Sequence, residues 1–137
     1  MAFWLVKSEP EKWSWASQVA AGEAGTHWNG VRNHSAKLSL MAMKLGEQAF
    51  FYHSNEGKAV VGIVKVIKLY YPDPSDAACK FGMVDFAAHQ PFSVPVTLEA
   101  IKAEAALKDM VLVNNSRLSV QPVREAEWEL VCKMGGL

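Results

Sequence analysis

A short run of the chain, HWNGVRN at His27–Asn33, combines a large aromatic ring with several polar side chains. Trp28 offers a face on which a flat ring can stack, and such stacking contributes about 1–3 kcal/mol per nucleobase. Asn33 carries both a hydrogen-bond donor and an acceptor, and Arg32 can bind a phosphate or a base edge through two hydrogen bonds. A hydrophobic core needs none of these polar groups, and a simple turn needs no tryptophan. The run therefore indicates a pocket that stacks a flat ring and hydrogen-bonds its edge.

Three further polar stretches lie beside predicted strands. KSEP (residues 7–10) closes the first strand, HSN (53–55) closes another, and RLSVQP (117–122) holds the last one. Strand ends are where a small barrel opens, so polar groups at such positions are suited to line a pocket.

Motifs of other function classes are missing from the sequence. It contains no phosphate-binding loop of the GxxxxGK[ST] type and no GxGxxG, GxSxG or HExxH motif. The histidines show no ligand spacing, and we expect them to be surface residues or hydrogen-bonded core residues: His27, His34, His53 and His89. These patterns predict neither a metalloenzyme nor an NTPase, and we expect no cofactor and no metal.

Two observations concern the cellular compartment. Cys79 and Cys132 lie far apart without CxxC spacing, which argues against a zinc site or a disulfide framework and favours a reducing compartment. The opening residues MAFWLVK lack the charged start and long apolar run of a signal peptide. We expect a cytoplasmic protein, or a nuclear one in a eukaryote.

The charge is balanced, with 14 Lys and Arg residues against 14 Asp and Glu residues. Proteins that coat a duplex through many phosphate contacts are usually strongly basic. We therefore expect a small footprint on any nucleic acid, with affinity that comes mainly from a pocket.

The elements that must position these residues are short strands with a few helices. We predict strands over 3–7, 48–53, 59–71, 83–87, 92–96 and 118–120, and helices over 15–21, 35–44 and 125–133, with one more after Thr97. Ser14, Asn33 or Ser35, and Thr97 are the predicted helix caps, and Gly46 is predicted to end the second helix.

The same pattern predicts several details of packing. We expect the first strand to be central, Gly62 to mark a bulge, and Pro122 to stop the last strand. Leu38, Met41 and Leu45 give the second helix one apolar stripe. The long strand is expected to carry Val61, Ile63, Lys65, Ile67 and Leu69 on one face. Leu98, Ile101 and Leu107 are expected inward from the helix after Thr97.

The length of 137 residues fits a single domain, and no apolar stretch approaches the ~20 residues that span a membrane. Many short strands with helices at their ends indicate an α+β fold, namely a small, partly open β-barrel.

Ordered blocks over nearly the whole chain, KSEPEKWSW, WNGVRN, FFYHSN, VGIVKV and LSVQPV, resemble the EVE domain family of the PUA-like superfold. This resemblance implies one domain over residues 1–137, with a bent barrel of five or six strands and peripheral helices. It also implies a pocket for a single, modified nucleobase, as in the related YTH and SRA readers, with a cytosine derivative in DNA or RNA favoured.

Transferred block by block, the resemblance gives these pocket candidates: Lys7, Ser8, Glu9, Trp28, Val31, Arg32, Asn33, Ser54, Asn55, Ser119, Gln121 and Pro122. Trp28, Val31 and Pro122 would form the wall against the extra group of the modified base, and the start of the second helix would hold a flanking phosphate. The chain departs from the family pattern at Asn29, at 34–37 and at Phe81, which bears on the choice of base. We expect a monomer that binds nucleic acid.

Each candidate also has a structural interpretation. Trp28 could be a core residue, Arg32 could bind carbonyl groups across the barrel mouth, and Asn33 could be only a helix cap. Ser54 and Asn55 could form only a hairpin turn, and residues 119–122 could be a strand with its terminating proline.

Two other functions compete with a non-catalytic reader. The related ASCH domains include hydrolases of acylated cytosine that use a lysine, a glutamate and a hydroxyl, and Lys7, Ser8 and Glu9 offer these types. However, neighbouring strand residues point to opposite faces, so Lys7 and Ser8 would share a face only if the strand ends there. The second alternative is a protein-interaction domain with a vestigial pocket, which a large exposed apolar patch would favour.

Overall fold

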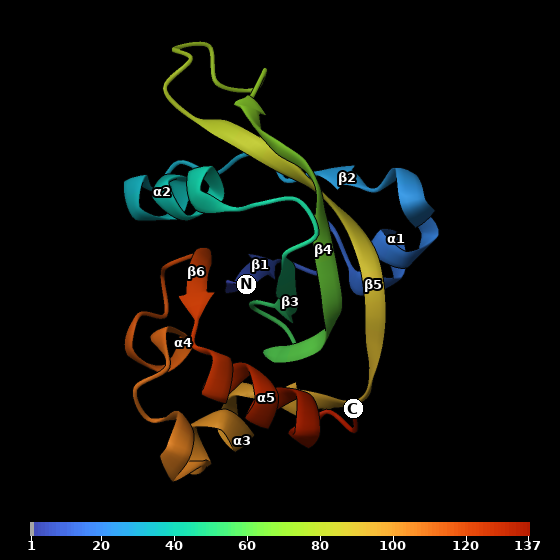
Figure 1. The fold of residues 1–137 in the computed structure, drawn as a ribbon, viewed down its shortest axis with the longest axis vertical. Helices are drawn as coiled ribbons and strands as arrows, with labels where there is room; N and C mark the ends of the chain where they lie inside the picture. The colour runs from blue at the N-terminus through green and yellow to red at the C-terminus, as the bar shows by residue number, and fades with distance from the viewer. Residues whose placement is uncertain (1) are drawn as a thin grey trace.

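A computed structural model describes residues 2–137 as one mixed, curved sheet with helices packed at its two ends (Figure 1). The strands are β1 (Phe3–Ser8), β2 (Thr26–His27), β3 (Gln48–His53), β4 (Ala59–Pro72), β5 (Gly82–Thr97) and β6 (Val120–Val123). The helices are α1 (Trp15–Ala20), α2 (His34–Ala42), α3 (Leu98–Ala103), α4 (Val111–Asn114) and α5 (Glu125–Met134), with 3-10 turns η1 (Gly22–Ala24) and η2 (Ala105–Leu107).

The sheet has the strand order β2-β5-β4-β3-β1-β6. Its two edge strands, β2 and β6, are not paired with each other in the part of the chain described, so the sheet bends without closing. This arrangement confirms the predicted α+β fold with a partly open barrel. None of the described helices combines the length and apolar character that a membrane crossing requires.

The first strand is central, as predicted. β1 pairs in parallel with β3 and antiparallel with β6, and Leu5 and Val6 are fully buried. β6 begins later than predicted, at Val120, and Pro122 lies inside it opposite Trp4 rather than ending it. An edge strand tolerates a proline because its outer N–H positions need no strand partner.

β4 and β5 form a long antiparallel ribbon that runs the length of the molecule (Figure 1). The prediction of two separate strands over 83–87 and 92–96 was wrong, because β5 continues through Pro91, which pairs with Gly62 at one of several register shifts. The predicted bulge at Gly62 is confirmed, and a side chain there would strike the ring of Trp15.

The residues expected on one face of the long strand do not form one buried side of β4: Val61, Ile63, Lys65, Ile67 and Leu69 range from buried to exposed. Val60, Val64 and Val66 are buried as well as Ile63, whereas Leu69 is exposed. The register shifts change which positions face inward, and the first half of β4 is covered on both faces.

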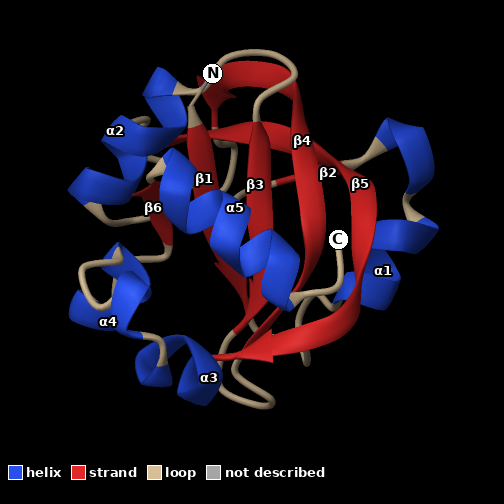
Figure 2. Cartoon of the chain, turned by 60° about the horizontal axis from the view of Figure 1, so that its bottom comes forward, coloured by secondary structure: helices blue, strands red, loops and turns tan. Residues whose placement is uncertain are grey.

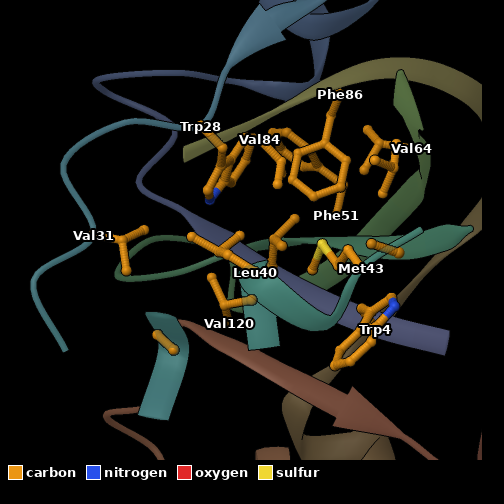
Figure 3. Close-up of a cluster of buried hydrophobic side chains, with 14 of the residues drawn as sticks. Trp4, Trp28, Val31, Leu40, Met43, Phe51, Val64, Val84, Phe86 and Val120 are labelled. Atoms are coloured by element: carbon orange, nitrogen blue, oxygen red, sulfur yellow. The ribbon is translucent and has the colours of Figure 1, made fainter. Parts of the chain in front are cut away.

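Two hydrophobic clusters lie on opposite faces of the sheet. One packs beneath α2 and includes Trp4, Trp28, Leu40, Phe51, Phe86 and Val120 (Figure 3). The other lies beneath the C-terminal helices and includes Leu5, Phe50, Tyr52, Ile101, Leu107 and Trp128. Figure 2 shows α5 crossing this second face. There, the ring of Trp128 stacks on Phe50 at 3.9 Å between ring centroids.

The predicted caps are confirmed, but two helices differ from the prediction. Ser14, Asn33 and Thr97 each accept a backbone N–H at the start of α1, α2 and α3. α2 ends at Ala42 rather than at Lys44, and Gly46 does not cap it. α3 ends at Ala103, so Leu107 reaches the core from η2 instead.

The apolar stripe predicted for α2 faces solvent. Leu38, Met41 and Leu45 are exposed, while Ala36 and Leu40 of the helix and Met43 just beyond it are buried. Both sets have helical spacing, so periodicity alone does not decide which stripe is covered. The smaller Ala36 allows this side to approach the sheet closely.

Candidate functional site

A cavity of about 370 Å³ opens at the end of β1. Its walls come from the end of β1, the turn before α1, and β2 with the residues after it: Lys7, Ser8, Glu9, Lys12, Trp13, Thr26, His27, Trp28 and Asn29. The volume lies in the range of small-molecule sites, and two aromatic residues stand beside several polar ones. We call this space the β1 cavity.

Trp28 belongs both to the β1 cavity and to the core. The residue is only 7% exposed, and its ring meets Phe51 and Phe86 edge-on at centroid distances of 5.7 and 5.4 Å (Figure 3). Its backbone N–H donates to the carbonyl of Val84. The prediction of a partly wet ring that costs little stability was wrong, because the ring fills space between two core phenylalanines. Its indole N–H finds no acceptor among the described residues.

Lys7 and Ser8 point to opposite faces of β1. The Lys7 ammonium group donates to the Ser116 carbonyl at 2.7 Å and lies over the Tyr52 ring, and burial lowers the pKa of Lys7. The Ser8 hydroxyl donates to the Trp13 carbonyl on the other face. The next residue, Glu9, forms an exposed ion pair with Lys12 at 3.5 Å.

His27 is a cavity residue that the sequence did not single out. Its Nδ1 lies 3.1 Å from Asp85 Oδ1 and 2.9 Å from the Tyr71 hydroxyl, which itself donates to Asp85 at 2.5 Å. Burial, the hydrogen bond to Asp85 and the nearby carboxylate charges raise the pKa of Tyr71 to about 12, so the phenol keeps its proton. Asp85 therefore holds one side of the imidazole, while Nε2 has no partner among residues 2–137.

The second half of the run HWNGVRN, residues 30–33, is held by contacts away from the β1 cavity. The Asp73 side chain is fully buried and accepts hydrogen bonds from the Gly30 N–H at 2.8 Å, from Arg32 Nη1 at 3.3 Å, and from both the N–H and the hydroxyl of Ser75. Arg32 Nη2 also donates to Ser75. We call Gly30, Arg32, Asp73 and Ser75 the Asp73 clamp.

The clamp carboxylate is ionised over a wide pH range. Burial acts to raise the pKa of Asp73, but the hydrogen bonds from Ser75, Gly30 and Arg32 outweigh it and lower the pKa to about 2. Arg32 is thus a structural residue bound to a carboxylate and a hydroxyl, and it does not line the β1 cavity.

Val31 and Asn33 also have structural positions. Val31 is buried in the cluster beneath α2. Asn33 Oδ1 accepts the Ala36 N–H at 3.0 Å, which is the predicted cap.

The remaining candidates lie away from the β1 cavity. Ser54 and Asn55 line a second cavity on the other side of Lys7. The Ser119 carbonyl accepts the Lys7 N–H, and Pro122 is exposed on the edge of the sheet. Gln121 is fully buried, with its Nε2 bonded to the Leu118 carbonyl and its Oε1 without a partner among the described residues.

The structure therefore does not gather the candidates into one pocket. It brings Lys7, Ser8, Glu9 and Trp28 to the β1 cavity, and the expected site that joined Trp28 to Arg32, Asn33, Ser54 and Gln121 was wrong. Sequence reasoning missed the other wall residues, Lys12, Trp13, Thr26, His27 and Asn29. The only local signal for them was their place beside the KSEP and WNGVRN blocks.

The described residues contain no group of three or more His, Cys, Asp and Glu side chains arranged to hold a metal ion. The walls of the β1 cavity combine two tryptophan rings and hydrogen-bonding side chains with the residues Lys7 and Lys12.

Comparisons with known proteins place this geometry in a family. The EVE domain model matches residues 2–134. The structure of Rpa0253 from Rhodopseudomonas palustris superposes with a TM-score of 0.94 at 62% identity, and the match covers 99% of this chain and 94% of that one. An ASCH protein from Zymomonas mobilis, at 13% identity and a TM-score of 0.60 over 96% of this chain and 94% of its own, shares the fold.

Human (Homo sapiens) thymocyte nuclear protein 1 is 37% identical over 163 residues, which cover 96% of this chain and 72% of the human protein. The human protein has also been solved in complex with DNA that contains 5-methylcytosine. That structure matches with a TM-score of 0.92 at 34% identity and covers 100% of this chain and 99% of its own. Together, the family model, these relatives and the bent sheet show that the chain belongs to the EVE domain family.

Proposed function

We propose that the protein is a non-catalytic nucleic-acid-binding module whose β1 cavity accepts one modified base, a cytosine derivative, turned out of its strand. The observation that carries this proposal is a cavity with aromatic and polar walls in a chain whose human relative has been solved with 5-methylcytosine DNA. A base leaves its stack at a cost of a few kcal/mol, which new contacts must offset.

The wall residues supply such contacts. Trp13 and Trp28 offer aromatic surface, and the Trp28 indole N–H offers a donor for a base carbonyl. Glu9 offers carboxylate acceptors, which suit the N4 amino group of cytosine, and His27 Nε2, which has no partner among residues 2–137, offers a further hydrogen-bonding position. A methyl group at C5 gains apolar contact against an aromatic wall.

Lys12 suits the backbone that flanks the base. Lys7 and Lys12 both line the β1 cavity, but the Lys7 ammonium group is turned towards Ser116, so a nucleotide seated in the cavity brings a phosphate near the positive charge of Lys12. With zero net charge overall, we expect few phosphate contacts and a shallow salt dependence.

The geometry favours binding over hydrolysis. A serine nucleophile needs a base within hydrogen-bond reach. Among the described residues the Ser8 hydroxyl is bonded only to the Trp13 carbonyl, and the Lys7 ammonium lies on the opposite face with Ser116. Lys7 and Ser8 therefore do not form the reactive pair that an ASCH-like hydrolase would use.

Fluorescence anisotropy with matched oligonucleotides tests the proposal. DNA and RNA strands that differ only in one cytosine or 5-methylcytosine are titrated with the protein, and mass spectrometry checks the strands for any product. We expect tighter binding of the methylated strand without turnover. Equal affinity for both strands, or conversion of the base, contradicts the proposal.

A Trp13→Ala variant links the result to the β1 cavity. Trp13 is only partly buried and lines the wall, so its loss should weaken binding of the methylated strand by about 1–3 kcal/mol through lost stacking. Phe3→Ala, which removes a partly buried aromatic ring at the end of β1 that lies away from the cavity, is the matched control and should leave the affinity unchanged.

A further inference from the structure

A second cavity, of about 200 Å³, lies on the other side of Lys7 from the β1 cavity. It is bounded by the end of β3, the β3–β4 turn, the start of α3, and α4 with the loop that follows it. Its lining residues are Lys7, Tyr52, Ser54, Asn55, Lys58, Leu98, Leu112 and Ser116. Because Lys7 lines both spaces, a ligand that fills one can extend past this side chain into the other.

The second cavity is rich in donors and contains no carboxylate. Lys7 and Lys58 bring two positive charges, and the other polar lining side chains are hydroxyls and one amide. Lys7 gives one N–H to the Ser116 carbonyl, which leaves two for a ligand. Lys58 is exposed and forms no ion pair with any residue from 2 to 137. A site of this composition suits an anion that only accepts hydrogen bonds.

Tyr52 gives independent support for a ligand. The residue is only 3% exposed, and its hydroxyl has no hydrogen-bond partner in the described part of the chain. Burial raises the pKa of Tyr52, so the hydroxyl stays protonated and remains a donor. Tyr52 Oη is not among the fully buried side-chain atoms that lack a partner, so the hydroxyl meets the cavity space and is free to donate to a ligand oxygen there.

The walls of the cavity are tied together by the backbone. The Ser54 N–H donates to the Ser8 carbonyl at 2.9 Å, which fixes the β3–β4 turn against β1. The Leu98 N–H donates to the Lys58 carbonyl at 2.8 Å, which fixes the start of β4 against α3. The backbone that carries these donors is therefore held in place before any ligand arrives.

We propose that the second cavity binds a phosphate group of the nucleic-acid backbone next to the base held in the β1 cavity. Lys7 and Lys58 neutralise its charge, and the hydroxyls of Tyr52 and Ser54 donate to its oxygens. This inference rests on the proposed function, and it adds a site that fixes the strand without reading its sequence. Free inorganic phosphate has the same chemistry, and the test distinguishes the two sources.

The test compares Lys58→Gln, Tyr52→Phe and the control Lys133→Gln, which changes an exposed lysine on α5 outside both cavities. We expect Lys58→Gln to weaken binding of methylated and unmethylated strands by the same factor, because a phosphate contact carries no base information. The slope of log binding constant against log salt concentration should shrink by about 0.7 for a single strand. Tyr52→Phe, which keeps the ring, should weaken binding about tenfold through one lost hydrogen bond to a charged group.

An uncharged methylphosphonate linkage beside the modified base locates the contact. It should weaken binding by the wild-type protein and cause little further loss in Lys58→Gln. Inorganic phosphate is titrated in parallel while NMR follows the amides of Ser54 and Asn55, which should shift in the wild type and not in Lys58→Gln.

The outcomes separate the two proposals. If strands bind with methyl preference but Lys58→Gln and Tyr52→Phe behave like Lys133→Gln, the phosphate site is overturned and the proposed function stands. If inorganic phosphate shifts the Ser54 and Asn55 amides but no strand binds, the cavity binds free phosphate and not a phosphate of the nucleic-acid backbone. In that case the proposed function also fails. If neither ligand binds, both proposals are overturned.

Discussion

The two halves of the segment His27–Asn33 are used differently. His27, Trp28 and Asn29 line the β1 cavity, while Gly30 and Arg32 belong to the Asp73 clamp. His27 also has a carboxylate partner, Asp85, but only Nδ1 of its ring is occupied, and the side chain remains 66% exposed. Arg32, in contrast, donates hydrogen bonds to the fully buried carboxylate of Asp73 and to the hydroxyl of Ser75. A polar side chain can therefore bind a ligand only through the hydrogen-bonding atoms that its partners within the fold leave free.

The largest effect should come from Trp28→Ala. Because its ring fills space between Phe51 and Phe86, the substitution should lower the free energy of unfolding by about 3–5 kcal/mol. Urea unfolding measures this loss. Trp13→Ala, in the wall of the same cavity but more exposed, should lose much less. Equal stability losses in the two variants would show that Trp28 is not a core residue.

Asp73→Asn should remove the clamp without touching the cavity. The loss of charge-assisted hydrogen bonds should cost about 1.5–3 kcal/mol of stability, since such bonds are stronger than neutral ones. Asp109→Asn, at an exposed carboxylate, is the control. The folded variant should keep its preference for the methylated strand, and loss of that preference would break the distinction between the two halves.

Acid should weaken the same clamp. The folded pKa of Asp73, about 2, lies below its ordinary value of 3.8, so the carboxylate adds stability above about pH 4 and loses it as the pH falls towards 2. Unfolding measured from pH 5 to pH 3 should show this decline in the wild type and a shallower one in Asp73→Asn. Parallel curves for the two proteins would contradict the role given to Asp73.

Asn33 should behave as a cap and not as a base reader. Asn33→Ala should cost about 1 kcal/mol of stability, whereas Asn33→Ser, which keeps a capping oxygen, should cost less. Neither change should alter the affinity for a methylated strand measured by anisotropy. A lower affinity in Asn33→Ser at unchanged melting temperature would assign Asn33 to the ligand.

The smallest effect on stability should come from His27→Ala. The side chain is largely exposed, so stability should change by less than about 0.5 kcal/mol. The affinity for the methylated strand should fall by about 0.5–1.5 kcal/mol if one hydrogen bond is lost. His34→Ala, an exposed histidine outside the cavity, is the control. Unchanged affinity in His27→Ala would remove His27 from the binding site.

Local features of the fold were predictable because their causes lie within a few residues. Ser14 and Thr97 cap helices through amides three positions later, and the run at 3–7 is rich in bulky residues that favour a strand with a buried centre. The exposed stripe of α2 was not predictable, because Leu38 and Leu40 both belong to sets with helical spacing. The continuity of β5 through Pro91 depends on a register shift opposite Gly62, which lies on another strand.

The site divides in the same way. Lys7, Ser8 and Glu9 were predictable because a strand ends there, and the wall of the β1 cavity begins with them. The prediction that Arg32 lines the pocket was wrong because its partner, Asp73, is 41 positions away in the sequence. No residue close to Arg32 in the sequence indicates that it binds a buried carboxylate. His27 was overlooked for the same reason, since Asp85 and Tyr71 give it a fixed orientation only in the folded chain.

The position of β1 also determines when the molecule can fold. Its residues pair with 48–53 on one side and with 120–123 on the other, so β1 is synthesised before both of its neighbours, and its second neighbour is made long after its first. Pairings across such a separation, as between Val6 and Val120, are slow to form because a long loop must close. During synthesis at about 5–20 residues per second, one edge of β1 therefore stays unpaired until β6 has been made. Lys7, whose backbone N–H donates to the Ser119 carbonyl, therefore reaches its final place only after the residues around β6 have been made.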